Sequence, residues 1–365
     1  MKISICVAIY NIDEKYLREC LDSVTADKSP QAEIILGDDC SVEKCAEICR
    51  EYAASDSRIK YIRAAENGGV SRMRNAMIDA ASGDYIVFVD GDDVVSEDYV
   101  KSLLKVCQTD YDIVMFDREN FSDTAPKTDF SEEEIRSIEP GAARVFSKSC
   151  ITGAPPQIEK YGIKNGTPSS VCTKAYRRDF ILQNNLKFKP GLKKSQDVEF
   201  NTGTFFHCKK LGYLPKSMYM YRINPTSICH RYSADLENII DDCIKYDLEN
   251  MNKFFPNDEE CAALWGKYKL ILHIISNFEL NIFHHDNPKG KLARKEDFLE
   301  FVSAPPFDEF FKNFDFNSYD WNERRLVLRA AKKKNFELLN FMYKYPLSFR
   351  VYGKIKAVFG KLRRG

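Results

Sequence analysis

Short apolar runs alternate with amphipathic segments along the first hundred residues. Runs of four to seven residues rich in Ile, Val and Tyr predict strands, because β-branched and aromatic side chains suit a buried sheet. The longer segments repeat apolar residues every three or four positions, as helices packed on a core do. We predict strands at 3–9, 33–37, 59–62 and 85–89, and helices at 14–24, 42–52, 71–81 and 96–106.

This alternation predicts an α/β fold with a mostly parallel central sheet and helices on both faces, because right-handed crossovers join such strands. Residues 117–170 have a weaker pattern, which predicts a long excursion with one short helix near 132–138. Regular patterns return at 171–182 and 212–221. After a boundary near 225–232 the period is almost entirely helical.

We therefore expect three parts of different character. An α/β domain occupies 1–230, with halves 1–107 and 108–230, and a helical region follows over 231–345. The last part is a tail over 346–365, in which apolar residues recur every three or four positions. Seven basic residues and no acidic one occur from residue 344 onward, which favours an anionic membrane surface as the partner of this tail. The alternative is a helix that packs on its own domain.

The composition narrows the class of protein further. Lys and Arg total 54, as do Asp and Glu, so the net charge gives no indication of a nucleic-acid partner. No run of 18 apolar residues occurs, and the N-terminal segment is too short and mixed for a signal peptide. We expect a cytoplasmic protein, bound peripherally at the inner face of the cell membrane if the tail binds lipid.

Three carboxylates in four positions follow the apolar run 85–89. Asp90, Asp92 and Asp93 would repel one another at the end of a buried strand, so a cation is needed to offset their charge. Oxygen ligands of this kind suit Mg²⁺ or Mn²⁺, and such ions usually hold a phosphate. The cluster therefore indicates a metal-dependent enzyme with a phosphorylated substrate. The alternative is a turn in which Asp accepts backbone N–H groups.

Two other predicted strands also end in polar residues, Tyr10-Asn11 and Asp38-Asp39. The carboxyl ends of parallel strands meet at one edge of the sheet, where ligands bind in such folds. Between these strands, Asn67-Gly68-Gly69 permits a tight turn before a helix with basic residues in its first turn. Such a helix start suits phosphate oxygens, so we expect these motifs to line one crevice. An ordinary loop and a helix cap are the alternatives.

The order and spacing of these motifs resemble family 2 glycosyltransferases of the GT-A fold. The resemblance covers about residues 1–230. It rests on Tyr10-Asn11, Asp38-Asp39-Cys40-Ser41, Asn67-Gly68-Gly69-Val70-Ser71, Arg74-Asn75 and Asp90-Gly91-Asp92-Asp93. The chain departs from the family pattern at Ala8, where Pro is common, and at Cys40, where Gly is common.

The resemblance implies a site for a nucleotide-diphosphate sugar. Ala8 and Tyr10 would flank the nucleotide base, which is most often uracil in the family. Asp39 would hydrogen-bond the base, and Asn67 would approach it from the other side. Arg74 would meet the diphosphate.

The resemblance also implies a metal site for Mn²⁺ or Mg²⁺. Asp92 would ligate the ion, and Asp90 would reach the ribose or a metal-bound water. His230 follows a stretch that resembles the end of the family's catalytic domain, and some relatives bring a late His to the metal or the diphosphate. The alternative for His230 is a surface residue without a role.

An inverting transfer needs a base that takes the proton of the acceptor hydroxyl. Residues 193–200 resemble the Glu-Asp-x-x-Phe motif of the family, with Gln196 in place of Glu, and Asp197 aligns with the base. Glu199 is the rival candidate. On a helix these two side chains point about 200° apart, so only one should face the site. The alternative for Asp197 is a helix cap.

We therefore predict a metal-dependent inverting glycosyltransferase of the hexosyl or N-acetylhexosaminyl class. The expected donor is a UDP-sugar, and the expected acceptor is a glycan or lipid-linked glycan in bacterial surface-polysaccharide biosynthesis. A haloacid-dehalogenase-like phosphatase is one alternative, because residues 90–94 also fit Asp-x-Asp-x-Val with Asp90 as nucleophile. A non-catalytic module that binds nucleotide sugar or glycan is another, suggested by Gln196.

Overall fold

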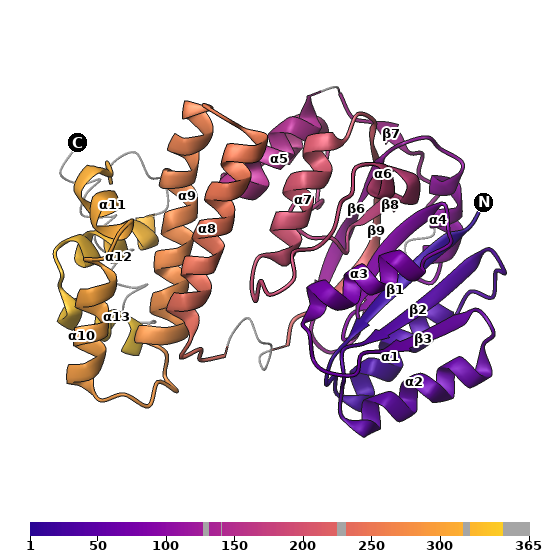
Figure 1. Ribbon diagram of the computed structural model, residues 1–365, viewed down its shortest axis with the longest axis horizontal. Helices are drawn as coiled ribbons and strands as arrows, with labels where there is room; N and C mark the ends of the chain where they lie inside the picture. The colour runs from indigo at the N-terminus through magenta and orange to yellow at the C-terminus, as the bar shows by residue number, and fades with distance from the viewer. Residues whose placement is uncertain (127–130, 140, 225–230, 317–321, 346–365) are drawn as a thin grey trace. The chain divides into compact units, whose positions relative to one another are not determined.

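Figure 1 shows the computed structural model of the chain, which describes all residues except 127–130, 140, 225–230, 317–321 and 346–365. Two sequence predictions, the metal ligand His230 and the amphipathic tail, lie outside the described residues. The chain forms two compact units: residues 1–224 with 243–257, and residues 225–242 with 258–365. In the described part of the chain, no helix combines the length and the apolar character needed to span a bilayer.

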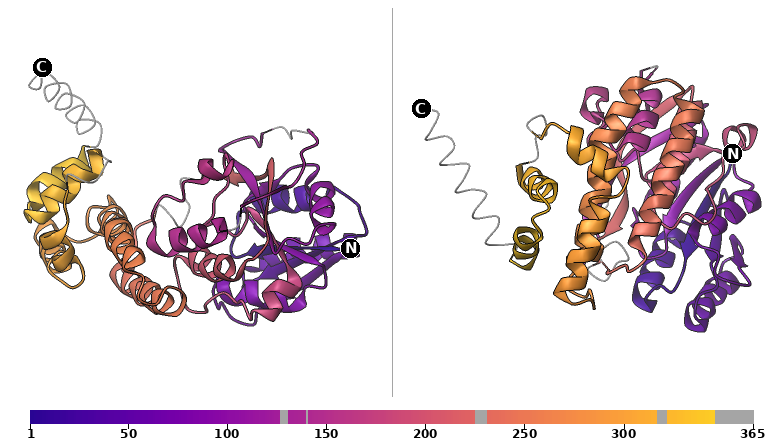
Figure 2. Two further views of the ribbon diagram at one scale, coloured as in Figure 1. Left: turned by 90° about the horizontal axis from the view of Figure 1, so that it is seen from above. Right: turned by 60° about the vertical axis from the view of Figure 1, so that its left-hand side comes forward.

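One half of the central sheet consists of four parallel strands in the order β3-β2-β1-β4. The two middle strands are buried on both faces, because crossover helices cover the sheet from either side (Figure 2). Each of the four predicted strands is confirmed to within one residue. They span Ile3–Ile9 (β1), Ala32–Asp38 (β2), Ile59–Arg63 (β3) and Tyr85–Asp90 (β4).

The four predicted helices of this half are also confirmed. Asp13 caps the first, where its side chain accepts a hydrogen bond from the Lys15 amide. The last begins three residues later than predicted, because the Ser96 amide donates to the Met218 carbonyl and residues 94–95 form a short strand. The helices are Glu14–Thr25 (α1), Glu43–Ser55 (α2), Val70–Ala80 (α3) and Tyr99–Cys107 (α4).

The other half of the sheet mixes strand directions. β8 is antiparallel to β4 and to β6, whereas β9 runs parallel to β6 and carries β5 and β7 as antiparallel neighbours. Six of the nine described strands point the same way, so the mostly parallel sheet is confirmed. The strands are Val94–Val95 (β5), Ile113–Phe121 (β6), Arg136–Ser137 (β7), Lys174–Arg177 (β8) and Leu211–Arg222 (β9).

The predicted helix near 132–138 is wrong. Arg136 and Ser137 form β7 on β9, and the Ile138 amide extends this pairing by donating to the Leu211 carbonyl at 2.9 Å. The unpaired backbone edge of β9 offers hydrogen bonds that outweigh the weak helical pattern of this segment. The nearest helix, α5 (Ala142–Thr152), starts only after Gly141, whose φ is 101°.

Helices from the part after residue 107 complete the first unit. α5 packs against α7 (Gln196–His207), while α6 (Arg178–Gln183) follows β8 directly. A 3₁₀ turn occupies Ile158–Tyr161 (η1). α8 runs from Leu236 to Phe254, and its part from Cys243 onward belongs to this unit.

The second unit is helical, as predicted. Phenylalanines form the centre of its core, where Phe278 contacts Phe283, Phe298 and Phe301 at ring-centroid distances of 5.5–6.2 Å. Besides the start of α8, its described helices are Glu259–Asn277 (α9), Phe278–Ile282 (η3, a π-helix), Lys291–Phe301 (α10), Phe307–Asn313 (α11), Asn322–Lys332 (α12) and Phe336–Lys344 (α13).

Candidate active site

The carboxyl ends of β1, β2 and β4 meet at one edge of the sheet, as predicted. In the ladder, Ala8 of β1 lies between Gly37 of β2 and Asp90 of β4. Tyr10 follows β1 and is 45% exposed. Asp39 follows β2, and its amide donates to the Ile9 carbonyl at 2.9 Å. Three motifs that are distant in the sequence therefore lie side by side.

Asp39 holds the glycine turn before α3. Its carboxylate accepts from the side-chain amide of Asn67 at 2.9 Å and from the backbone amides of Gly68 and Gly69 at 2.9 and 2.7 Å. Gly69 has a φ of 81°, a backbone conformation that glycine adopts without strain. The predicted base-binding residues Asp39 and Asn67 are thus bonded to each other.

Arg74 of α3 is the centre of the site. Its guanidinium donates to Asp197 Oδ1 at 2.5 Å and to Asp90 Oδ1 at 2.8 Å, and it lies 5.3 Å from the ring centre of Phe188. The residue is only 4% exposed. Burial by itself would lower the pKa of Arg74. The nearby carboxylates of Asp197 and Asp90 together have the larger effect and raise this pKa above its ordinary value. Arg74 therefore joins α3, β4 and α7.

The three carboxylates after β4 have different surroundings. Asp93 is buried, accepts from the Tyr219 hydroxyl at 2.5 Å and from the Arg222 amide at 2.7 Å, and so fastens the strand end to β9. Asp90 bonds to Arg74, as described above. Among the described residues, the Asp92 carboxylate has no ion pair and no hydrogen bond from another residue, and its hydrogen bond is to its own backbone amide. Burial, and then the charge of Asp90, raise the pKa of Asp92.

The surroundings of Asp92 are those of a metal ligand. A part-buried carboxylate that has a raised pKa and no partner from another residue is stabilised by a cation. One carboxylate with phosphate oxygens and waters is a common ligand set for Mg²⁺. The residues therefore fit an ion at Asp92. In the described part of the chain, the cluster of three potential ligands is elsewhere, at His284, His285 and Asp286 in the second unit.

Asp197 and Glu199 point in different directions, as predicted for two positions on one helix. Asp197 Oδ2 accepts from the Val171 amide at 3.0 Å, opposite its bond to Arg74. Glu199 instead lies near Lys189, Lys253 and Asn250. Its Oε2 is buried without a partner, and burial raises the pKa of Glu199 to about 7. Of the two acidic residues, only Asp197 lies with Arg74 and Asp90.

Several residues that contact the site had no signal in the sequence pattern. The Cys172 thiol lies 3.6 Å from Asp90 Oδ2. Arg222 is buried, and its Nε donates to the Asp92 carbonyl at 2.8 Å. Tyr219 donates to Asp93, and its oxygen accepts from the Asp90 amide at 3.2 Å. These residues come from β9 and from the segment before β8, which only the folded sheet brings to β4.

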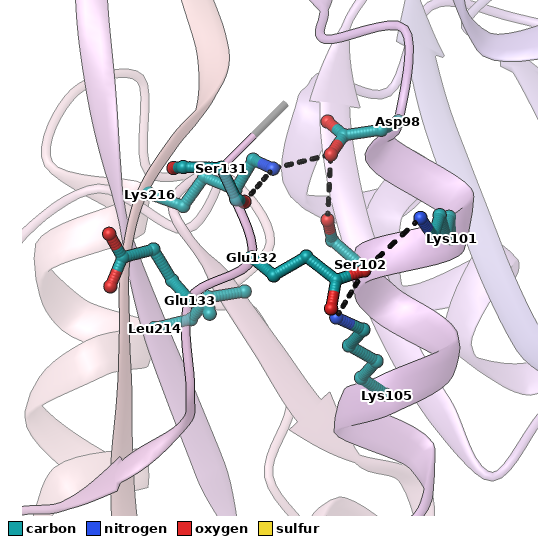
Figure 3. Close-up of a pocket in the computed structure, with 9 residues that line it drawn as sticks. All are labelled: Asp98, Lys101, Ser102, Lys105, Ser131, Glu132, Glu133, Leu214 and Lys216. Atoms are coloured by element: carbon teal, nitrogen blue, oxygen red, sulfur yellow. Dashed lines mark hydrogen bonds and ion pairs between the residues drawn. The ribbon is translucent and has the colours of Figure 1, made fainter. Parts of the chain in front are cut away.

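A separate small pocket lies between α4, β9 and residues 131–133 (Figure 3). Most of its charged groups pair with one another: Lys216 bonds to Asp98 at 2.5 Å, and Glu132 forms ion pairs with Lys101 and Lys105 at 3.5 and 3.7 Å. None of the predicted site residues lines it. We therefore place the candidate active site at the strand ends and not in this pocket.

Comparison with solved structures identifies the fold. A crystal structure of Staphylococcus aureus TarS 1–349 in complex with UDP-GlcNAc superposes with a TM-score of 0.60 at 18% sequence identity. The superposition covers 95% of this chain and 92% of that one. The two chains thus share the GT-A fold.

Sequence comparison matches the N-terminal part of the chain to a known family. Residues 4–157 match the family model described as glycosyl transferase family 2. The EpsH protein of Bacillus subtilis (strain 168) is 30% identical over 247 residues, which cover 64% of each chain. Glycosyltransferase GlyA of Streptococcus pneumoniae serotype 4 is 32% identical over 228 residues, 62% of this chain and 31% of GlyA. Residues 4–157 therefore resemble glycosyl transferase family 2, and the chain spans less than two thirds of the length of these relatives.

Proposed function

We propose that the protein is a metal-dependent inverting glycosyltransferase that uses a UDP-sugar. The observation that carries the proposal is the Arg74 cluster, in which one buried guanidinium joins Asp90 to Asp197 at 2.8 and 2.5 Å. A carboxylate at the end of a strand and a carboxylate on a later helix are thus held in one site. A donor bound at the strand ends would therefore lie next to Asp197, which removes the proton of the acceptor hydroxyl.

Asp197 is the proposed base. It lies in the first turn of α7, where the helix dipole favours a negative charge, and both of its oxygens are held by protein donors. A carboxylate fixed in this way is oriented before the acceptor arrives. In the transfer it takes the proton of the acceptor hydroxyl as that oxygen attacks the anomeric carbon of the sugar.

Donor binding is assigned to the other strand ends. Tyr10 is exposed beside the sheet edge, and Asp39 and Asn67 form the turn before α3. Asp92 would hold a Mg²⁺ or Mn²⁺ ion. Such an ion, when bound, offsets negative charge on the diphosphate leaving group. The TarS structure named above contains UDP-GlcNAc, which supports a UDP-sugar as the donor here as well.

The acceptor and the location are further parts of the proposal. Poly(ribitol-phosphate) beta-N-acetylglucosaminyltransferase TarS of Staphylococcus aureus (strain MW2) is 24% identical over 226 residues, 60% of this chain and 35% of TarS. By analogy, we propose a surface glycan or lipid-linked glycan as the acceptor. The basic tail 346–365 would bring the enzyme to an anionic membrane surface.

Donor hydrolysis tests the proposed activity. UDP-, GDP- and dTDP-sugars are incubated with Mn²⁺ and either the wild type or the Asp92→Asn variant, and release of the nucleotide is measured. We expect turnover of one UDP-sugar and its loss in the variant. Failure of the wild type to turn over any sugar or to bind any nucleotide with metal would overturn the proposal. Phosphate release from simple phosphomonoesters would support the phosphatase instead.

Vesicle cosedimentation tests the membrane part separately. The full chain and a variant that lacks residues 346–365 are mixed with vesicles of phosphatidylcholine alone or with phosphatidylglycerol. We expect only the full chain to bind, and only to the anionic vesicles. Equal binding by both proteins would exclude the tail as the membrane contact.

A further inference from the structure

A lysine lies fully buried beneath the candidate active site. Lys174 begins β8, where Met115 of β6 is its ladder partner, and its relative exposure is 0%. Its ammonium donates to the carbonyl of Thr167 at 2.8 Å and to the carbonyl of Ser170. It also lies 5.5 Å from the ring centre of Phe205. Burial lowers the pKa of Lys174 to about 7, so the position is an unfavourable one for a positive charge.

The two carbonyls belong to one turn. The Ser170 amide donates back to the Thr167 carbonyl at 3.1 Å, which closes the turn. Asn201 of α7 donates to the Ser169 carbonyl at 3.0 Å, and Asn201 is itself held by the Tyr176 hydroxyl at 2.6 Å. The turn is therefore fixed from inside the protein, with Lys174 as its charged donor.

A single peptide unit connects this lysine to the proposed base. The peptide between Ser170 and Val171 accepts from Lys174 at its carbonyl and donates from its N–H to Asp197 Oδ2 at 3.0 Å. A trans peptide is planar, and its C=O and N–H point in opposite directions. A cation bonded to the carbonyl polarises the unit and strengthens the hydrogen bond that the N–H makes. Lys174 thus acts on Asp197 without touching it.

Turn closure alone does not require a charged residue. A neutral amide can donate to a carbonyl at lower desolvation cost than a buried ammonium. The second oxygen of Asp197, however, depends on this one N–H, because its first oxygen is bonded to Arg74. A polarised N–H holds the Asp197 carboxylate in a fixed orientation before the proton transfer.

We propose that Lys174 is a positioning residue for Asp197, which it orients through the Ser170–Val171 peptide. This inference rests on the proposed function, because it assigns Lys174 to the base of the transfer. Removal of the ammonium takes the donor from the Ser170 carbonyl, whereas the Thr167 carbonyl still accepts from the Ser170 amide, and it weakens the N–H bond to Asp197. The variant should therefore slow the proton-transfer step. Binding of the nucleotide should be retained, because its proposed contacts follow β1 and β2.

The test compares two buried lysines of the same unit. Lys216 is 5% exposed and also donates to a carbonyl, that of Ser131, but it bonds to Asp98 in the separate pocket of Figure 3. Lys174→Met and Lys216→Met thus remove the same group from two buried positions, of which only one lies behind Asp197. For each variant the measurements are kcat and KM for the UDP-sugar that the wild type turns over, the Kd for UDP and the Tm.

We expect Lys174→Met to lower kcat by about 10- to 100-fold, the value of a hydrogen bond to a charged group, with the Kd for UDP within about twofold of wild type. Lys216→Met should lower the Tm but keep kcat within about twofold. Lys174→Gln retains a donor without the charge, so its kcat should lie between those of the wild type and Lys174→Met. If Lys174→Met does not fold, the kcat of Lys174→Gln alone tests the role of Lys174.

The outcomes separate the two proposals. A wild type without donor turnover overturns the proposed function and the role of Lys174 together. An active wild type whose kcat is unchanged in Lys174→Met, or in Lys174→Gln when only that variant folds, overturns the role of Lys174 alone. A similar loss of kcat in Lys216→Met would show a general effect of lower stability and would also overturn it.

Discussion

At Arg74 one guanidinium joins two carboxylates that are 16 and 123 positions away in the sequence. The residue is buried, so its charge is stable only while Asp90 and Asp197 remain ionised beside it. The resemblance predicts that Arg74 meets the diphosphate. In the described structure its two terminal nitrogens are bonded to carboxylates and its Nε is buried without a partner, so the diphosphate contact stays a prediction.

Replacement of the proposed base gives the first prediction. Asp197→Asn keeps the shape of the side chain but removes its charge and its capacity to take a proton. We expect kcat for transfer to fall about 10²- to 10⁴-fold with UDP binding retained. Steady-state kinetics and calorimetric titration with UDP measure the two effects. Glu199→Gln is the matched control, and full activity in Asp197→Asn would contradict the assignment.

Glu199 gives a prediction for the pH dependence of stability. Its pKa is raised from 4.5 to about 7 by burial, so between these pH values the folded protein binds more protons than the unfolded chain. The free energy of unfolding therefore falls as the pH rises through this window. Glu199→Gln removes this loss, and we expect it to be more stable than wild type above pH ~7 by on the order of 2 kcal/mol.

Urea unfolding of both proteins from pH ~5 to ~8 measures this difference. The two curves should approach each other towards pH ~5, where Glu199 is protonated in the folded protein. A difference in stability that does not change with pH would contradict the buried state of Glu199.

At the scale of elements, the turn between β3 and α3 depends on the residue that follows β2. Asp39 accepts three hydrogen bonds from Asn67, Gly68 and Gly69, and these bonds fix the start of the helix that carries Arg74. The spacing of the motifs predicted that they would meet at one edge. It did not predict that Asp39 and Asn67 bond to each other, because hydrogen bonds between segments depend on the strand register.

The third prediction concerns this turn. In Asp39→Asn, one backbone N–H of the glycine turn faces an amide NH₂ instead of an acceptor. We expect a loss of about 1–3 kcal/mol in the free energy of unfolding, with weaker UDP binding. Urea unfolding and UDP titration measure both. Asp79→Asn, an exposed partner of Lys187, is the control and should change the stability by less than about 0.5 kcal/mol.

At the scale of the whole molecule, α8 takes part in both compact units. Its second half packs on the first unit, where Arg144 donates to the Phe254 carbonyl at 3.0 Å and lies 4.4 Å from the ring centre of Phe255. Both phenylalanines are buried. The sequence placed a boundary before α8 because the helical period starts there, and periodicity does not report what a helix packs against.

Truncation gives the fourth prediction. A fragment of residues 1–257 keeps the second half of α8, whereas a fragment of residues 1–224 exposes the surface that Phe254 and Phe255 cover. Each buried Phe contributes about 2 kcal/mol, so we expect the shorter fragment to melt roughly 10 °C lower and to aggregate more readily. Thermal melts and gel filtration compare them. Equal melting temperatures would contradict this packing.

The sequence alone determined the elements of residues 1–107 and the order of their motifs, because strand and helix periods and glycine turns are local properties of the chain. The family resemblance supplied Asp197 as the candidate base, and the angle between helix positions predicted that Asp197 and Glu199 would face apart. Only the tertiary structure decided that Arg74 is buried between Asp90 and Asp197, that residues 136–137 join β9, and that Lys174 lies behind Asp197. These contacts join residues far apart in the sequence, and their strength depends on burial and register, which no local pattern records.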